Sequence, residues 1–440
     1  MKPPLNRLSA TQLARMIAAR DASCEAVAHS FIDAVHQGEA DVHAFAWFDA
    51  VRALETAREF DRVEWRGPLH GLPVAVKDNI DTADFPSEYG STIYIGHVPP
   101  ADAACVAALR SAGSWVFGKT VTAELANFTP GATRNPRGLA HTPGGSSSGS
   151  AAAVAAHMAP FALGTQTAGS VIRPASFCGV VGFVPTRGAV PRAGVKAVSD
   201  TLDVVGGFAR SVEDVALLAS AIALQPTWQH APAQVAPPAV AWTATPWAAQ
   251  LAPSMRTALE RVARLLAVRG ARVRELAWPY DAAGDAADFT GLVDAQRIVQ
   301  TYETARGLGP EAQYRREGLS ARLAALIDEG RAIAAPAYIE ALALQRACAT
   351  QIATLIGADD VLLTPSAPGE APLGLGSTGD PLFNRPWHAL GGPQISVPLP
   401  QSLAHGESGL PLGLQLVGRP GDDARVLAAA AWMERQLAQH

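Results

Sequence analysis

The fold is decided by residues 144–184, GGSSSGSAAAVAAHMAPFALGTQTAGSVIRPASFCGVVGFV. Residues 150–158 are rich in alanine, which favours a helix. Phe161–Gln166 and Cys178–Val184 are short apolar runs bounded by Gly, Ser or Pro, which is typical of buried strands. This stretch therefore predicts a helix followed by strands, with turns rich in small residues between them.

The same alternation continues on both sides of this stretch. Further strands are predicted at Leu69–Ile80, Ser114–Lys119, Ala239–Ala244, Arg272–Leu276, Asp360–Pro365, Gln394–Leu399 and Leu412–Gly418. Further helices are predicted at Cys24–His36, Asp102–Ala112, Ser211–Leu224, Ser254–Gly270 and Asp423–Leu437, and Ser9 with Gln12 forms a capping box that opens another. Alternating strands and helices predict an α/β fold, with a large mixed, mostly parallel sheet covered by helices.

The 440 residues fit roughly three domains of ordinary size or one large one. We expect a single domain over residues 1–440, of which residues 1–60 form an N-terminal helical segment. Residues 282–357 lack strand signals, so we expect a helical elaboration there before the C-terminal strands.

Composition excludes several classes of protein. The net charge is −5 and only 17% of residues are charged, which argues against a nucleic-acid-binding surface. Residues 151–164 are the most apolar stretch and are too short to span a bilayer, and the first residues lack the apolar stretch of a secretory signal. We expect a cytoplasmic protein with no metal, because the four cysteines are widely spaced and no histidine motif is present. The cysteines are Cys24, Cys105, Cys178 and Cys348.

Two serine-containing turns carry the candidate chemistry. Gly144 and Gly145 precede three serines, Ser146–Ser148, at a predicted helix start, and an ordinary N-capping loop is the alternative interpretation. Ser170 follows a strand in a run of small residues. Such a run lets successive backbone N–H groups face one point, as an oxyanion hole requires.

A serine nucleophile needs a base. His141 and His157 flank the serine loop without an evident orienting acid. Lys77 is the alternative, because it ends an apolar strand and burial lowers the pKa of a lysine. The chain has only four lysines, Lys2, Lys77, Lys119 and Lys196, so a lysine in an apolar setting suggests a role that needs loss of its proton.

At these residues the chain resembles the amidase signature family, serine hydrolases that use a Ser-Ser-Lys set. Five stretches follow the family pattern. They are the Gly/Ser-rich stretch from Gly144 onward, PVAVKDNI (73–80), GKTVTAELA (118–126), GGPQISVPL (391–399) and GLPLGLQLVG (409–418). The resemblance runs from about Leu8 to Leu437 and is weakest between Gln225 and Gly357. It implies the amidase signature fold.

The resemblance also implies roles. The nucleophile falls on Ser170 and the general base on Lys77. The bridging serine falls on Ser146; in the family a cis peptide bond holds this serine. Lys77 would accept the proton of Ser146, which in turn accepts that of Ser170. The oxyanion hole falls on the backbone N–H groups of Thr167, Ala168, Gly169 and Ser170.

The chain departs from the family pattern around the nucleophile. Gln166 stands for an aspartate, Ala168 for a glycine and Ile172 for an arginine, with Arg173 displaced by one position; Val184 replaces a common lysine. Because the two charged positions change together, we expect an ion pair that braces the nucleophile turn to be replaced by a neutral arrangement. The Ala168 methyl group would narrow the oxyanion hole.

The segment Phe383–His388 is a candidate wall of a substrate pocket. Arg385, Trp387 and His388 precede a predicted strand and are candidates to line that pocket, with Arg385 binding a carboxylate or carbonyl group. An ordinary packed loop is the alternative.

The predicted function is hydrolysis of a small-molecule carboxamide C–N bond through a Ser170 acyl-enzyme, releasing ammonia or an amine. This hydrolysis also needs no cofactor. The alternatives are the glutaminase subunit of a tRNA-dependent amidotransferase and a urea-pathway hydrolase of allophanate or carboxybiuret type. Gln166 and Ile172 favour a stand-alone hydrolase, and the resemblance makes a homodimer plausible. From a different class, Gly113–Thr120 matches the pattern of a phosphate-binding P-loop, but its apolar centre is typical of a strand.

Overall fold

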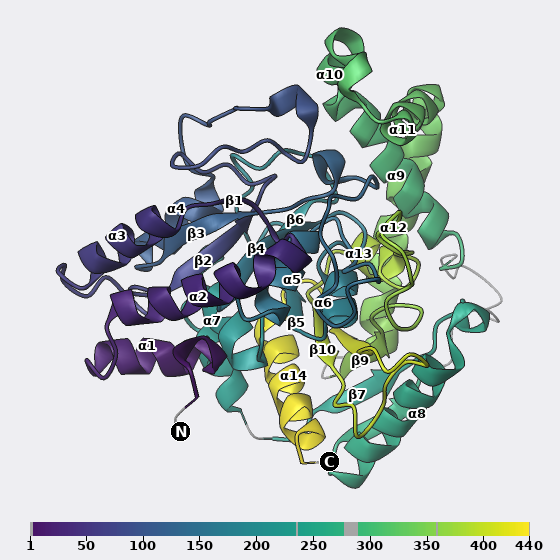
Figure 1. Cartoon of the computed structure of the whole chain (residues 1–440). Coiled ribbons are helices and arrows are strands. Elements are labelled where there is room, and N and C mark those ends of the chain that lie inside the picture. Colours follow the sequence, from purple (N-terminus) through teal and green to yellow (C-terminus); the bar gives the residue numbers. More distant parts are fainter. Residues whose placement is uncertain (1–2, 235, 277–288, 358–359, 440) are drawn as a thin grey trace.

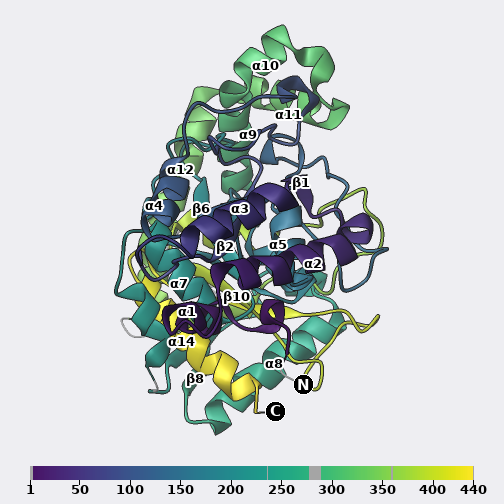
Figure 2. The same cartoon turned by 60° about the vertical axis from the view of Figure 1, so that its left-hand side comes forward.

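The computed structural model describes residues 3–234, 236–276, 289–357 and 360–439. One sheet of eleven strands runs through it, in the order β1-β3-β2-β4-β6-β5-β10-β11-β9-β7-β8, with helices packed around it (Figures 1 and 2). The strands are β1 Phe45–Phe48, β2 Pro73–Lys77, β3 Trp115–Thr120, β4 Phe161–Gln166, β5 Val181–Val184, β6 Val204–Ala209, β7 Ala239–Trp242, β8 Arg272–Glu275, β9 Asp360–Pro365, β10 Gln394–Pro398 and β11 Gly413–Val417.

The α-helices alternate with these strands along much of the chain. They are α1 Ala10–Ala18, α2 Cys24–Val42, α3 Ala50–Phe60, α4 Ala104–Ser111, α5 Ser148–Ala155, α6 Ile172–Cys178, α7 Val212–Ile222, α8 Pro253–Val268, α9 Leu292–Gly307, α10 Gly309–Tyr314, α11 Ala321–Ala332, α12 Ala335–Ile356, α13 Arg385–Leu390 and α14 Asp423–Leu437. The predicted capping box is present at the start of α1, where Ser9 and Gln12 exchange side-chain and backbone hydrogen bonds.

The mixed α/β sheet is confirmed, but it is not mostly parallel. The parallel pairs are β3–β2, β2–β4, β9–β7 and β7–β8, and the six other pairings are antiparallel. In the described chain no α-helix separates β5 from β6 or β10 from β11, so each of these strand pairs runs antiparallel, as a connection without a crossover helix allows.

Two regions bear on the expected organisation. The first sixty residues hold α1, α2 and α3 and also the short strand β1, which the local sequence patterns did not predict. Between residues 289 and 357 the chain is helical, from α9 to α12, and α10 and α11 form the projecting upper part of Figure 1. Residues 282–288 of the predicted helical elaboration lie outside the described residues.

The neighbouring parallel strands β2 and β4 determine where the candidate site lies. Both are buried along their whole length, and Val76 pairs with Leu163 in their register. Because parallel strands end at the same edge of a sheet, Lys77 at the end of β2 lies beside the last residues of β4. Helix α5 packs on β4 with small side chains, all of them buried, which keeps the serine loop close to that edge.

Candidate active site

Lys77 is completely buried, and its amine faces two hydroxyl groups. Its Nζ lies 2.9 Å from Ser146 Oγ and 2.8 Å from Thr165 Oγ1. Burial lowers the pKa of Lys77 to about 7, while the negative charge of Asp203 raises it. Within the described parts of the chain Lys77 has no ion-pair partner. A large share of Lys77 is therefore neutral near pH 7 and able to accept a proton.

The three serines of the loop have different partners. Ser146 follows a cis peptide bond from Gly145 and is the serine that contacts Lys77. Ser147 Oγ donates to the Thr165 carbonyl oxygen at 3.2 Å, and Ser148 Oγ donates to the Gly144 carbonyl oxygen at 2.8 Å. The hydroxyls of Ser147 and Ser148 thus bond to the backbone and order the loop.

Ser170 lies in the turn between β4 and α6 and is more exposed than its buried neighbours. None of the hydrogen bonds found among the described residues is donated by the N–H groups of Ala168, Gly169 or Ser170, so these groups can bind a developing oxyanion. A Cβ on Gly169 would come within 2.4 Å of Asn384 Oδ1, so this close approach requires glycine.

Arg173 connects the two serine turns. Its Nη2 donates at 2.6 Å to the carbonyl oxygen of Gly145, the residue before Ser146, and its Nε donates at 2.8 Å to the Thr378 carbonyl oxygen. Arg173, Thr378 and Ser170 line the same pocket. The Ser146 turn therefore adjoins the Ser170 pocket, although no hydrogen bond joins the two hydroxyls among the described contacts.

The side chain that braces the turn around Ser170 is neutral, as the departures in sequence suggested. Gln166 Oε1 accepts hydrogen bonds from the backbone N–H groups of Val171 at 3.0 Å and Ile172 at 3.1 Å. Gln166 Nε2 lies 3.2 Å from His388 Nδ1 and 3.4 Å from Gln394 Oε1. Ile172, at the position of the family's arginine, is buried among apolar side chains.

A narrow pocket with a volume of only about 10 Å³ opens at Ser170. Its walls come from the segment after β3, the turn around Ser170, α6, α9 and the loop before α13. They consist of Ala126, Asn127, Phe128, Thr167, Ala168, Gly169, Ser170, Arg173, Gln300, Thr378 and Pro381. The four predicted oxyanion-hole residues therefore face this pocket.

Two polar atoms of the lining residues are buried without partners in the described structure: Arg173 Nη1 and Asn127 Oδ1. Arg173 is 3% exposed, and burial lowers its pKa to about 9. A hydrogen bond from Asn127 Nδ2 to the Leu125 carbonyl oxygen, at 2.9 Å, fixes the orientation of the Asn127 amide. The pocket thus offers one cationic donor and one acceptor.

The predicted substrate residues near α13 do not lie together at this pocket. Arg385 Nη1 donates to the side-chain oxygens of Gln296 and, at 3.0 Å, Gln300, and Gln300 lines the pocket. Trp387 is completely buried in an apolar cluster, and His388 is buried against the Leu202 carbonyl oxygen. The expectation that Trp387 and His388 contact substrate is therefore corrected, because both point into the protein interior.

Sequence reasoning missed Thr165, Asn127, Thr378 and Gln300. Thr165 lies inside the quoted serine motif, but nothing in the motif shows that its hydroxyl faces Lys77. The other three come from distant segments that only the tertiary structure brings to the pocket.

Gly113–Thr120 does not form a phosphate-binding loop. Trp115–Thr120 is the buried strand β3, and the chain after it turns into a short 3-10 helix at Glu124–Ala126. Lys119 is buried and bonds to Ser87 and the Pro86 carbonyl oxygen rather than pointing outward from a loop.

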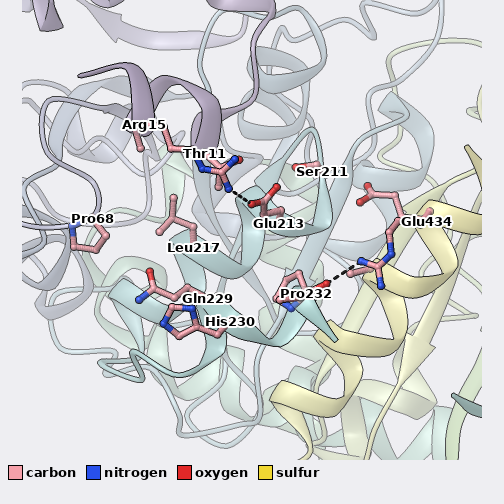
Figure 3. A pocket seen from close by; sticks show the side chains of 14 residues that line it. Thr11, Arg15, Pro68, Ser211, Glu213, Leu217, Gln229, His230, Pro232 and Glu434 are labelled. Carbon is pink, nitrogen blue, oxygen red and sulfur yellow. Dashed lines mark hydrogen bonds and ion pairs between the residues drawn. The ribbon is translucent and has the colours of Figure 1, made fainter. Parts of the chain in front are cut away.

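A wider groove of about 580 Å³ lies elsewhere, between α1, α7 and α14 (Figure 3). Both of its arginines have partners within the protein. Arg15 bonds to Glu213 at 2.8 Å, and Arg435 donates to the Pro232 carbonyl oxygen at 2.8 Å. None of the candidate catalytic residues lines this groove.

Three further findings concern the described residues alone. No group of three or more His, Cys, Asp or Glu side chains there is arranged to hold a metal ion. No helix there has the length and apolar character needed to cross a membrane. Cys24, Cys105, Cys178 and Cys348 are buried and form no disulfide among the described residues.

Comparison with known proteins gives consistent matches over nearly the whole chain. The Amidase family model matches residues 26–427. A component of the glutamyl-tRNA(Gln) amidotransferase of Symbiobacterium thermophilum is 33% identical over 98% of this chain and 97% of its own. The same component of the Thermus thermophilus amidotransferase is 34% identical over 94% of each chain.

Solved structures agree with this similarity. The peptide amidase from Stenotrophomonas maltophilia superposes with a TM-score of 0.83 at 27% identity, covering 99% of this chain and 98% of that one. A crystal structure of an amidase gives a TM-score of 0.86 at 29% identity, covering 98% and 100%. The chain therefore belongs to the amidase family, the amidase signature enzymes, and is an amidohydrolase.

Proposed function

We propose that the chain hydrolyses carboxamide C–N bonds with Ser170 as nucleophile, Ser146 as proton bridge and Lys77 as general base. The observation that carries the proposal is the buried Lys77 amine, which lies 2.9 Å from Ser146 Oγ and has no ion-pair partner among the described residues. A serine hydroxyl becomes a good nucleophile when a base removes its proton, and a neutral lysine supplies that base.

The reaction starts with transfer of the Ser146 proton to Lys77 and of the Ser170 proton to Ser146. As its proton leaves, Ser170 Oγ bonds to the carbonyl carbon, and the carbonyl oxygen takes the negative charge. The N–H groups of Ala168, Gly169 and Ser170 donate to that oxygen. Collapse of the intermediate breaks the C–N bond, while the proton returns through Ser146 to the leaving nitrogen.

Water then completes the cycle. It attacks the Ser170 ester and passes its proton along the same route, and the acid is released with Ser170 restored. Ammonia leaves a primary amide and an amine leaves a substituted one. These steps use side chains of this protein and no cofactor.

The substrate class in this proposal is an amide that also bears a carboxylate. Arg173 is a buried cation without an ion-pair partner in the described structure, and its Nη1 is unpartnered. A buried charge is costly unless it is paired, so an anionic substrate group is its natural partner. Arg385, linked to the pocket through Gln300, adds a second positive charge nearby.

A glutaminase component of a tRNA-dependent amidotransferase is the second candidate, and the curated relatives support it more than they support a stand-alone hydrolase. Those relatives are named as components of a glutamyl-tRNA(Gln) amidotransferase and match along nearly their whole length. Glutamine is a primary amide with a carboxylate, so it also fits the charge of Arg173. The likeness to a peptide amidase supports the stand-alone enzyme.

Ammonia or amine release from a panel of amides tests the proposal. The panel holds glutamine, half-amides of dicarboxylic acids, ureido acids, neutral primary amides and aryl amides, with Ser170→Ala as the blank. Turnover by the wild type and none by the blank supports the proposed nucleophile; turnover by the blank contradicts it.

The quaternary state separates the two candidates. A homodimer active on its own supports the stand-alone hydrolase, and glutaminase activity only in a complex with partner proteins supports the amidotransferase. Size-exclusion chromatography with light scattering measures the molar mass of the chain purified alone and of the protein purified from its native host. A cytoplasmic location belongs to the same proposal and agrees with four buried cysteines that form no disulfide in the described structure.

A further inference from the structure

His388 is held in one tautomer by its surroundings. It is 1% exposed, and its Nε2 lies 2.7 Å from the Leu202 carbonyl oxygen. A carbonyl oxygen only accepts hydrogen bonds, so Nε2 carries the proton and Nδ1 presents a lone pair. That lone pair faces Gln166 Nε2 at 3.2 Å and Gln394 Nε2 at 3.3 Å.

Gln166 links His388 to the nucleophile turn. Its Nε2 faces His388 Nδ1, and its Oε1 accepts hydrogen bonds from the backbone N–H groups of Val171 and Ile172. The Gln166 amide therefore has one orientation only, with its nitrogen toward His388 and its oxygen toward the turn. These two N–H groups directly follow Ser170 in the chain.

We propose that His388 is a positioning residue that fixes the Gln166 amide and, through it, the backbone turn that presents Ser170. This inference rests on the proposed role of Ser170. It gives His388 a role in the reaction without contact with substrate.

The charge state of His388 agrees with this role. Burial, together with the charge of Arg187, lowers the pKa of His388 to about 3. Arg187 Nη2 donates to the His388 carbonyl oxygen at 2.5 Å. The imidazole is therefore neutral under working conditions. A carboxylate at position 166 would direct an oxygen lone pair at the Nδ1 lone pair, which explains why an amide stands there.

Three replacements of His388 test the proposal. His388→Asn keeps an acceptor near the Nδ1 position, His388→Gln keeps a donor near the Nε2 position, and His388→Phe keeps the ring without either. We expect kcat to fall by about 10²-fold in His388→Phe and His388→Gln, because small displacements of a nucleophile cost about that much. His388→Asn should recover at least a tenth of the wild-type kcat, with KM little changed in all three.

A purely structural role gives a different pattern. In that case kcat follows the melting temperature of each variant, and His388→Asn, which leaves the largest void, is the poorest of the three. That result overturns the proposal, as does a wild-type kcat in a folded His388→Phe. If instead Ser170→Ala stays active, the proposed function has failed and not this inference alone.

Gln166→Glu supplies a second, independent readout. The new carboxylate still accepts from Val171 and Ile172, but it offers His388 Nδ1 a donor only when a proton is taken up. The ratio of variant to wild-type kcat should therefore rise as the pH falls, with an ionisation that the wild type lacks. A ratio that is constant with pH contradicts the proposed contact.

Discussion

The amine of Lys77 and the hydroxyl of Ser146 meet at 2.9 Å, although the two residues are 69 positions apart in the chain. Lys77 reaches this point because it ends a buried strand that runs parallel to β4. Ser146 reaches it from the turn before α5. The meeting of a desolvated base and a hydroxyl determines what the site can do.

Lys77→Arg should lose kcat by about 10²–10⁴-fold, the contribution of a general base. Arginine keeps a positive charge but does not give up its proton in proteins, so it cannot act as the base. Steady-state kinetics with the best amide of the panel measure the loss, and circular dichroism checks that the variant is folded. A folded Lys77→Arg within tenfold of the wild type contradicts the role of Lys77.

Activity should rise with pH through about 7. Burial lowers the pKa of Lys77 to about 7, and the neutral form, which dominates above that pH, is the active one. The pH profile of kcat/KM for a substrate without its own ionisation in this range reports the pKa of the free enzyme. A profile that is flat from pH 5 to 9 is incompatible with Lys77 as the base.

Ser146→Ala and Ser148→Ala form a matched pair. Ser146→Ala removes the hydroxyl that contacts Lys77 and should lower kcat by about 10²-fold or more. Ser148→Ala removes a hydroxyl bonded to the Gly144 carbonyl oxygen and should retain most of the activity at some cost in melting temperature. Equal losses of kcat in the two variants would show that Ser146 only orders the loop.

An amide that carries a carboxylate should be a better substrate than the same amide with that carboxylate converted to a methyl ester. The half-amide of a dicarboxylic acid and the methyl ester of that half-amide differ in charge at one end only, so their kcat/KM ratio reports the contribution of the cation at Arg173. An ion pair with a buried, unpaired guanidinium predicts a preference of at least about tenfold. Equal kcat/KM values for acid and ester rule out Arg173 as a carboxylate partner.

Much of the fold follows from the sequence because its elements have strong local signals. The capping box at Ser9, the strand at Phe161–Gln166 and the helix at Asp423–Leu437 all stand where the patterns predict them. Strand direction has no such local signal. The chain passes from β10 to β11 without a crossover helix, so these two strands in the middle of the sheet pair antiparallel. The periodicity of apolar residues within each strand does not show this direction.

In the candidate site, too, local motifs can be predicted from the sequence, whereas contacts made by tertiary packing cannot. Lys77, Ser146 and Ser170 stand in short motifs with a chemical rationale, so sequence reasoning selects them. Arg385 and Trp387 stood out for their chemistry, but Trp387 packs in the core and Arg385 bonds to glutamines of α9. Which polar groups are left without partners depends on tertiary packing, so the importance of Arg173 emerges only from the structure.

Covalent labelling tests the central claim most directly. The wild type, Ser146→Ala and Lys77→Arg are treated with a fluorophosphonate, the labelled residue is mapped by mass spectrometry, and the labelling rates are compared at pH 8. The account predicts a single adduct on Ser170, formed quickly in the wild type and at least about 10²-fold more slowly in both variants. An adduct on another residue, or equal rates in all three proteins, would contradict it.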